Sequence, residues 1–465
     1  MMLNKGTHLY NSVDEVLEQA KKVVNHRVSD FNVNHRSLTP NNKGVIGQIV
    51  EEGVFHYPIN SNHEADFANL GIELKVTGLK FNKNRQLVMK ERLVLNIINY
   101  EEEALVDFNH SSFWGKNEVI LLIFYLYDYD LKDFDFMFLE SFLLRYNEKD
   151  LVIIKNDWLI IHNKILQGNA HNISEADTMY LAACPKGINS SSLRFQPYSQ
   201  IKAKQRAYCL KTSYMNTIVA SIFNKEQLES IFSLNQLQRD GFEIAVRTTL
   251  APYYGKCEDE LFEQFKVDRN SKAKYNMLVG AMLGLKGSIN RSEEFTKGNI
   301  ELKTIRVEED GHIEQHMSFP YFKYEEIVNQ EFEESDIFEK LYSTKFMFVV
   351  FKKKEGKYYF EKILFWNMPL SDIDEYVQPI FNKTVDVIKN GNIVKEETEN
   401  KLLTNFPGSK ENGVCHVRPH DAKGIKKLNN GLPLPVPDRL TGLTQYTRYC
   451  FWLDRNYIRK IIVNN

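Results

Sequence analysis

Residues 64–76 read EADFANLGIELKV, and this stretch decides the fold that we expect for the chain. Within residues 70–76 apolar and polar side chains alternate, which predicts a strand with one buried face. Glu73 and Lys75 are two positions apart and therefore project from the same polar face, and Asp66 just upstream can add a second carboxylate. Phosphodiester hydrolysis with Mg²⁺ uses such a set, because oxygen ligands hold the ion while a lysine supports the attacking water or the developing charge.

The same short pattern also fits an ordinary strand with a solvated Glu–Lys pair, so it leaves two interpretations open. The preceding residues favour the first. Residues 43–51 read KGVIGQIVE, with apolar side chains at helical spacing, and this helix would deliver Glu51 as one more carboxylate. Glu51 could equally be a surface residue of that helix, because Glu52 beside it is just as acidic.

These motifs together resemble a known family of nucleases. The pattern KG-x-x-G-x-x-x-E, followed by D-F-x-x-L-G-I-E-L-K, resembles the mismatch-repair nicking endonuclease MutH. Residues 90–101 (KERLVLNIINYE) are more similar to the staphylococcal type II restriction endonucleases that cut GATC. The likeness continues through residues 181–189 (LAACPKGIN) and 204–216 (KQRAYCLKTSYMN), in the family order, and it covers most of residues 40–220.

The resemblance implies a Mg²⁺ cofactor and roles for particular residues. The implied metal ligands and catalytic lysine are Glu51, Asp66, Glu73 and Lys75. The implied DNA contacts are Pro185, Lys186 and Tyr208. Lys116 is a candidate match to a further active-site lysine of MutH. One departure is an extra residue between Glu51 and Asp66, which the loop at residues 58–62 could absorb.

Basic residues are dense around these implied DNA contacts. Cations that suit phosphate contacts occur in residues 190–211, interleaved with tyrosines, and those that we expect at DNA are Arg194, Lys204, Arg206 and Lys211. A charged segment is also typical of a solvated face. In the second half of the chain, Arg418 and His420 occupy the corresponding loop, although His420 could equally be a surface histidine.

Length and composition fit this interpretation. A chain of 465 residues with 43% hydrophobic residues favours two domains. Its net charge of −2 gives no global attraction to a polyanion, so DNA binding requires a local basic surface. The five cysteines show no CxxC spacing, the start has no signal-peptide pattern, and the apolar run 119–127 is too short to cross a membrane. We therefore expect a soluble protein of the bacterial cytoplasm, without a membrane partner.

The second half of the chain repeats the motifs of the first. LGIELKV at 70–76 returns as GNIELKT at 298–304, and the other shared motifs follow in the same order. We therefore expect an α/β protein with two tandem MutH-like, restriction-endonuclease-like domains of the PD-(D/E)xK type, each with a mixed central sheet flanked by helices. The expected domains are 1–225, the nuclease, and 226–465, a degenerate DNA-binding or regulatory copy. In this alignment Gly284 replaces Glu51 and Glu294 corresponds to Asp66, and a site without the helix carboxylate would hold metal poorly.

Within the first domain we expect strands around residues 70–77, 91–99 and 119–127 to form the mixed sheet. The boundary between the domains is expected near residues 223–233, where the segment NKEQLESIF suggests a helix.

The leading hypothesis is a type II restriction endonuclease that cuts both strands of double-stranded DNA at GATC. The resemblance implies cleavage before the G and a second domain that binds another copy of the site as an effector. One active centre per chain implies that two chains meet on DNA or that one chain acts twice, and a cognate DNA methyltransferase is the expected functional partner. The alternatives are a MutH-type nicking endonuclease, which the duplicated half disfavours, and a GATC-binding regulator that does not cut.

Overall fold

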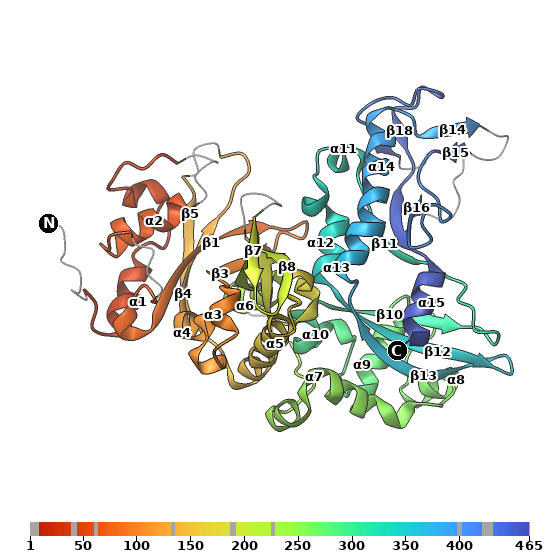
Figure 1. Cartoon of the computed structure of the whole chain (residues 1–465), viewed down its shortest axis with the longest axis horizontal. Coiled ribbons are helices and arrows are strands. Elements are labelled where there is room, and N and C mark those ends of the chain that lie inside the picture. Colours follow the sequence, from red (N-terminus) through yellow and green to blue (C-terminus); the bar gives the residue numbers. More distant parts are fainter. Residues whose placement is uncertain are drawn as a thin grey trace. The chain divides into compact units, whose positions relative to one another are not determined.

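The computed structural model describes residues 9–38, 44–59, 64–131, 135–186, 192–224, 228–397, 402–420 and 431–464. Lys43, the loop positions 60–62 and residues 187–189, on which parts of the motif analysis rest, lie outside the described residues. The chain divides into two compact units (Figure 1). The first contains Met1–Ile173, Asp177–Phe242 and Arg291–Gly298, and the second contains Ser174–Ala176, Glu243–Asn290 and Asn299–Asn465. Each unit consists of three separate segments of the chain, so this division does not correspond to a single boundary. The boundary at residue 225 therefore stays a prediction that rests on the sequence repeat.

A mixed four-stranded sheet forms the centre of the first unit. Its strands, in spatial order, are β2 (Leu87–Met89), β1 (Ile72–Phe81), β4 (Val119–Leu126) and β5 (Met137–Arg145). β1 runs parallel to β4, with Glu73 opposite Ile120, and the outer pairs are antiparallel. Residues 119–124 are buried because both faces of this strand are covered, which explains its continuous apolar sequence.

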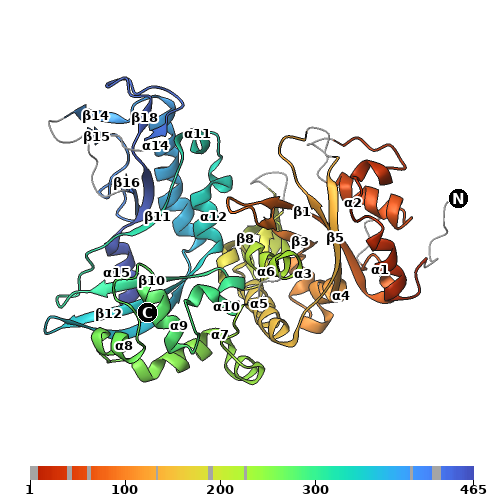
Figure 2. The same ribbon diagram turned by 180° about the vertical axis from the view of Figure 1, so that it is seen from behind.

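Helices cover this sheet. α1 (Val13–Lys21) begins at Ser12, whose hydroxyl accepts from the Glu15 backbone N–H at 3.2 Å and satisfies one of the helix's first amides. α1 and α2 (Val45–Ile49) bury their apolar residues against β4 and β5, and the two opposite views in Figures 1 and 2 agree on this placement. The other longer helices of the unit are α4 (Ser112–Asn117), α5 (Glu148–Leu166) and α6 (Thr212–Phe223).

A second, antiparallel sheet completes the first unit. Its order is β3 (Leu93–Ile97), β9 (Arg206–Leu210) and β6 (Leu181–Pro185). The expectation that residues 91–99 would join the central sheet is therefore wrong, because β3 pairs with β9 over a hundred residues later. A hairpin of β7 (Leu193–Gln196) and β8 (Ser199–Lys204) follows β6.

The predicted helix at the domain boundary is also absent from the described residues 228–232. Glu229 instead forms a β-bridge with Ser292, and the next helix, α7, begins at Leu234. α7 (Leu234–Leu250) breaks at Gly241, whose φ of 69° lies in the left-handed region that glycine tolerates.

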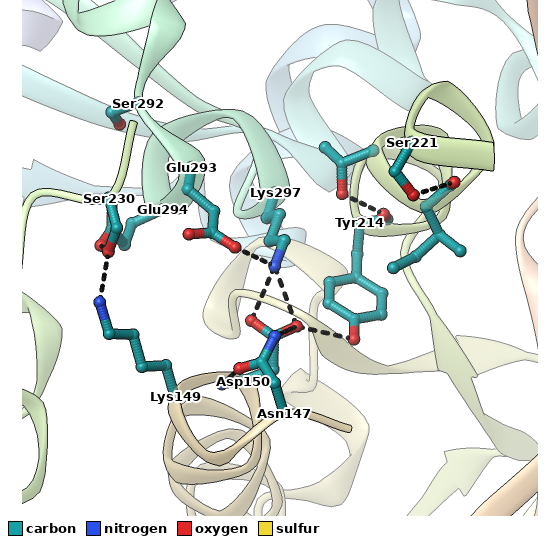
Figure 3. A network of polar contacts seen from close by, with 12 residues as sticks. Asn147, Lys149, Asp150, Tyr214, Ser221, Ser230, Ser292, Glu293, Glu294 and Lys297 are labelled. Atoms are coloured by element: carbon teal, nitrogen blue, oxygen red, sulfur yellow. Dashed lines mark hydrogen bonds and ion pairs between the residues drawn. The ribbon is translucent and has the colours of Figure 1, made fainter. Parts of the chain in front are cut away.

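A buried polar network joins α5 and α6 to the short helix α10 (Glu293–Lys297) within the first unit (Figure 3). The Lys297 ammonium lies 2.8 and 2.9 Å from the two Asp150 carboxylate oxygens and 2.6 Å from Glu293. The Tyr214 hydroxyl donates to Asp150 at 3.1 Å. Because both ends of the Lys297–Asp150 pair are buried, each charge depends on the other for its solvation.

The second unit repeats the strand order of the first. Its mixed sheet consists of β10 (Ile300–Val307), β12 (Lys345–Lys354) and β13 (Lys357–Trp366), with β10 parallel to β12. Its antiparallel sheet consists of β11 (Met317–Tyr321), β19 (Tyr449–Leu453) and β16 (Cys415–Pro419), again with the last strand of its half of the chain in the middle. This agreement confirms the predicted tandem α/β architecture.

The helices of the second unit pack on these sheets. Its main helices are α8 (Glu258–Gln264), α9 (Lys274–Met282), α12 (Asp336–Ser343), α14 (Gln378–Lys389) and α15 (Arg455–Asn464). The apolar residues of α12, α14 and α15 join those of β11, β12, β16 and β19 in one core. No helix among the described residues is long and apolar enough to span a membrane.

Candidate active site

Strand β1 places Glu73 and Lys75 side by side, as the alternating sequence predicts. The Lys75 ammonium lies 2.7 Å from Glu73 Oε1, and the Lys116 ammonium, from α4, lies 3.7 Å from the same oxygen. Glu73 is only 2% exposed, so it is not the solvated strand residue of the alternative interpretation. Two lysines therefore converge on one buried carboxylate.

A hydrogen bond from the backbone of β1 to its side chain fixes Asp66 next to this strand. Its Oδ2 atom accepts a hydrogen bond from the Leu74 N–H at 2.9 Å, which holds the carboxylate beside β1. Glu73 Oε2 is buried and makes no hydrogen bond among the described residues. A buried carboxylate oxygen without a donor is costly in a bare protein, but it is a natural ligand atom for a hard cation.

Glu51 comes from a π-helical turn, Val50–Val54, that continues α2. Turns of this kind are frequent at functional sites, because the extra residue redirects neighbouring side chains. The structure separates Glu51 from its acidic neighbour Glu52. Both Glu52 oxygens lie 2.7 Å from the Arg36 guanidinium, so Glu52 has a structural partner.

The charges of the other two carboxylates act on Glu51. Burial and the negative charges of Asp66 and Glu73 raise the pKa of Glu51 to about 7, against a smaller opposing effect of Lys75. Burial also raises the pKa of Glu73, although Lys75 and Lys116 oppose this shift. Carboxylates that repel one another in a partly dry site are stabilised when a divalent cation binds between them. The chemistry of Glu51, Asp66 and Glu73 therefore suits a hard metal ion, and because their oxygens do not all lie within 4.8 Å of one another, the side chains would have to close around it.

The corresponding strand of the second unit carries a different charge balance. Lys303 lies 2.7 Å from Glu301 Oε1, and Lys340 of α12 forms an ion pair with the other oxygen. Burial alone would raise the pKa of Glu301, but the two lysines outweigh burial and hold it below its usual value. The position aligned with Glu51 is Gly284, whose backbone is left-handed, with φ of 87°.

The carboxylate aligned with Asp66 is also engaged elsewhere. Glu294 belongs to the first unit, where it accepts from the Ser230 hydroxyl at 2.7 Å and the Ile231 N–H at 3.0 Å. The residues around Glu301 thus supply cations where the first unit supplies carboxylates. This set does not fit a divalent metal.

Four of the expected DNA contacts in the first unit are accessible. Pro185 and Lys186 are exposed at the end of β6, and Arg194 is exposed on β7, while Lys204 on β8 is half-buried. All four lie on or beside the β7–β8 hairpin and the end of β6. Pro185 pairs with Arg206 of β9, and Arg194 pairs with Ala203 of β8.

Three other expected contacts lie in the protein interior instead. Tyr208 is fully buried and donates its hydroxyl hydrogen bond to Glu103 at 2.8 Å. Arg206 is also fully buried, with a hydrogen bond to the Ala183 carbonyl, and Lys211 donates to the Thr178 carbonyl at 2.6 Å. Side chains covered in this way cannot reach a DNA duplex without local unfolding. This corrects the expectation for these three residues, which stabilise the sheet and its flanking turns.

The hairpin also exposes aromatic side chains that the motif analysis did not select. Phe195 and Tyr198 are 68% and 73% exposed, and the Lys202 ammonium lies 4.4 Å from the Phe195 ring centroid. The available signal is the interleaving of aromatic and basic residues in this segment, whereas the alternation in Leu193–Gln196 would place Phe195 on a buried face. In the second unit, Arg418 is half-buried on β16 and His420 is exposed just after it.

Comparisons with known proteins agree with this geometry. The family model of the DNA mismatch repair enzyme MutH matches residues 55–157 and 283–376, one segment in each half of the chain. The type II restriction enzyme Sau3AI of Staphylococcus aureus is 35% identical, over 97% of this chain and 98% of its own length. The mismatch repair protein MutH of Shewanella woodyi is 25% identical over 46% of this chain and 94% of its own length. The chain therefore belongs to the MutH-like type II restriction enzymes, and it is a site-specific deoxyribonuclease.

Proposed function

We propose that this chain cuts both strands of DNA at GATC, 5′ of the G, with Mg²⁺ as cofactor, and that its active centre consists of Glu51, Asp66, Glu73 and Lys75. The observation that carries the chemistry is the buried Glu73 carboxylate, which has one oxygen without a hydrogen bond and the other beside two lysines. GATC and the cleavage position rest on the motif resemblance of residues 90–101 and 181–189.

The residues divide the work by their chemistry. Glu51, Asp66 and Glu73 would hold the metal, which when bound activates water and stabilises the charge of the transferring phosphoryl group. Lys75 is held 2.7 Å from Glu73, so its ammonium is fixed where it can orient the attacking water. Lys116 adds a second positive charge on the same side, which favours an anionic phosphate in the site.

DNA would approach across the exposed end of β6 and the β7–β8 hairpin. Lys186 and Arg194 are suited to phosphate or base-edge contacts, and Lys204 to a phosphate contact. Because the chain has no overall positive charge, these local cations must supply the attraction.

The second unit would bind another copy of the site and stimulate the first. Its Glu301 is neutralised by two lysines, so it would present a positive surface to phosphate instead of a metal centre. Arg418 and His420 are the residues that we assign to this contact. Because each chain carries one active centre, two chains would meet on one cleavage site or one chain would act twice. A cognate methyltransferase would protect the host DNA.

The first test is digestion of unmethylated plasmid DNA with Mg²⁺, followed by sequencing of the ends. The wild type is compared with Glu73→Ala and with the matched control Glu301→Ala, which changes the equivalent strand residue of the second unit. We expect double-strand ends at GATC for the wild type and the control, and none for Glu73→Ala. Nicks alone would favour the MutH-type repair function, and DNA binding without cleavage by the folded wild type would contradict the catalytic assignment.

The effector role is tested on a plasmid with a single site. A short duplex that carries GATC is added in trans, and we expect it to accelerate cleavage by the wild type but not by Arg418→Ala. A duplex with a scrambled site is the control. Equal stimulation of both proteins, or none of either, would contradict the effector role without touching the catalytic assignment.

A further inference from the structure

The antiparallel sheet of the second unit brings together three metal-ligating side chains that lie far apart in the sequence. His316 directly precedes β11, His416 is the second residue of β16, and Asp454 directly follows β19. β19 lies between the other two strands, with Leu453 opposite both Met317 and Cys415. In this register the residues next to those core positions project to the opposite face of the sheet. His316, His416 and Asp454 therefore meet at one end of that face.

The three ligand atoms are close enough to act together. One ligand atom from each of these residues lies within 4.8 Å of the other two, and no other three His, Cys, Asp or Glu residues in the described part of the chain meet so closely. The two imidazole rings pack edge to face, with 4.7 Å between their centroids. The His316 Nδ1 atom lies 3.5 Å from Asp454 Oδ2.

His416 is the second, independent observation. Its side chain is fully buried, yet neither ring nitrogen has a hydrogen-bond partner among the described residues. A buried imidazole with two unsatisfied nitrogens is costly, and a metal ion is a partner that satisfies the lone pair of one of them.

The other two side chains are oriented by the start of α15. The Arg455 N–H donates to His316 Nδ1 at 3.1 Å, and the Asn456 N–H donates to Asp454 Oδ1 at 2.8 Å. The Asp454 carboxylate is thereby fixed by one oxygen, and its other oxygen is directed at His316. The Arg455 N–H occupies the Nδ1 lone pair of His316, so a metal ion bound at this atom must replace that hydrogen bond.

We propose that His316, His416 and Asp454 form a binding site for a divalent transition-metal ion of the zinc class. Two imidazoles and one carboxylate match the preference of such ions, whereas Mg²⁺ prefers sites of oxygen ligands alone. Tetrahedral zinc with bonds of about 2.0–2.1 Å holds its ligand atoms about 3.3 Å apart, so the side chains must close by small rotations. A solvent molecule would complete the coordination at the partly exposed His316 side.

The site has a structural consequence for the face that we assign to DNA. A metal bound here would join β11, β16 and the start of α15, three elements that the chain connects through long intervening segments. Arg418 lies two residues after His416 on the same face of β16. The charges of Arg418 and Arg455 oppose a cation, so the single carboxylate of Asp454 must offset them, and we expect moderate affinity.

The test measures Co²⁺ binding, because cobalt replaces zinc in such sites and its visible absorption reports imidazole coordination. The full chain is used in a Glu73→Ala background, which weakens the oxygen site of the first unit, after treatment with EDTA. We expect one Co²⁺ per chain with intense visible bands, displacement by Zn²⁺, and a higher unfolding temperature with Zn²⁺ than with EDTA.

Variants of the ligands decide whether the signal comes from this site. His316→Gln, at the half-exposed position, and His416→Gln should each weaken Co²⁺ binding about tenfold or more. His312→Gln is the matched control, because His312 is an exposed histidine of the same unit paired with Asp310. Absence of Co²⁺ binding by the folded parent, or equal binding by all three variants, would overturn the proposal. If His416→Gln does not fold, the His316→Gln result decides.

Discussion

The pKa of Glu51 makes metal binding by the nuclease unit depend on pH in a calculable way. Its carboxyl group has a pKa of about 7, raised chiefly by burial and by the charges of Asp66 and Glu73. A protonated carboxyl group is not a metal ligand, so the proton and the metal compete for Glu51, and metal binding releases the proton. The affinity must therefore rise as the pH rises through about 7.

The size of the effect follows from that value. With a pKa of about 7, Glu51 is ionised in about one chain in eleven at pH 6 and in about ten of eleven at pH 8. The apparent affinity for the metal should therefore be about tenfold weaker at pH 6 than at pH 8. An ordinary glutamate, which titrates near pH 4.3, would give almost no difference between these conditions.

The assay is calorimetric titration of the DNA-free protein with Mg²⁺ at pH 6, 7 and 8. In Glu51→Gln the affinity at pH 8 should fall, and its ratio between pH 8 and pH 6 should approach one. Glu52→Gln is the matched control, because Glu52 is paired with Arg36 and its pKa is lowered by that hydrogen bond. A wild-type ratio below about twofold, or a tenfold ratio that persists in Glu51→Gln, would refute the reasoning.

Three further predictions test the site and its support. Lys75→Ala should slow single-turnover cleavage by about 10²–10⁴-fold while DNA affinity in Ca²⁺ is retained, since the lysine acts on the reacting groups; equal loss of binding would contradict this role. Lys297→Ala should lower the free energy of unfolding by about 3–5 kcal/mol in urea titrations. The double variant Lys297→Ala with Asp150→Asn should recover part of this loss, because the buried carboxylate is then replaced by an uncharged amide. A loss below about 1 kcal/mol would show that the ion pair is not decisive for stability. Tyr208→Phe should lower the free energy of unfolding by about 1–3 kcal/mol without changing DNA affinity. Lys186→Ala should weaken DNA binding and reduce the slope of log affinity against log salt concentration by about one. The reverse pattern would place Tyr208 at the DNA surface.

The catalytic strand could be predicted from the sequence because its signal is local. Alternation in residues 70–76 determines which side chains share a face, and β1 has Glu73 and Lys75 together as expected. The repeat of this motif at 298–304 likewise predicted a second sheet, and β10 pairs with β12 as β1 pairs with β4. Short-range periodicity, and an ordered repeat of short motifs, predict structure reliably because each motif depends only on neighbouring residues.

The burial of the presumed DNA contacts could not be predicted in the same way. Residues 206–210 read RAYCL, and all five are buried because β9 is the central strand of its sheet. An Arg or Lys in such a strand requires a distant partner, and the partner of Arg206 is the carbonyl of Ala183 on the adjacent strand. Charge density along a sequence indicates the residues that could meet DNA, but strand order decides which of them are covered.

The separation of Glu51 from Glu52 has the same origin. Adjacent glutamates are equivalent in the sequence, and only the approach of Arg36 assigns one of them to structure. Glu51, on the π-helical turn, instead has its pKa raised by burial and by the charges of Asp66 and Glu73. Neither the Arg36–Glu52 ion pair nor the surroundings of Glu51 produce a periodic pattern in the sequence.

The two copies of the Glu-x-Lys strand show that the strand motif does not by itself specify a nuclease. Glu73 and Glu301 each have a lysine two residues later at 2.7 Å, so their immediate geometry is the same. Their pKa values move in opposite directions, because burial dominates at Glu73 while Lys303 and Lys340 together dominate at Glu301. Both lysines at Glu73 lie on one oxygen and leave the other without a donor, so a cation still stabilises this carboxylate. Glu301 has an ammonium group on each of its oxygens and has little to gain. The charge of the surrounding residues, contributed by helices far away in the sequence, therefore decides which copy can bind metal and which can only attract phosphate.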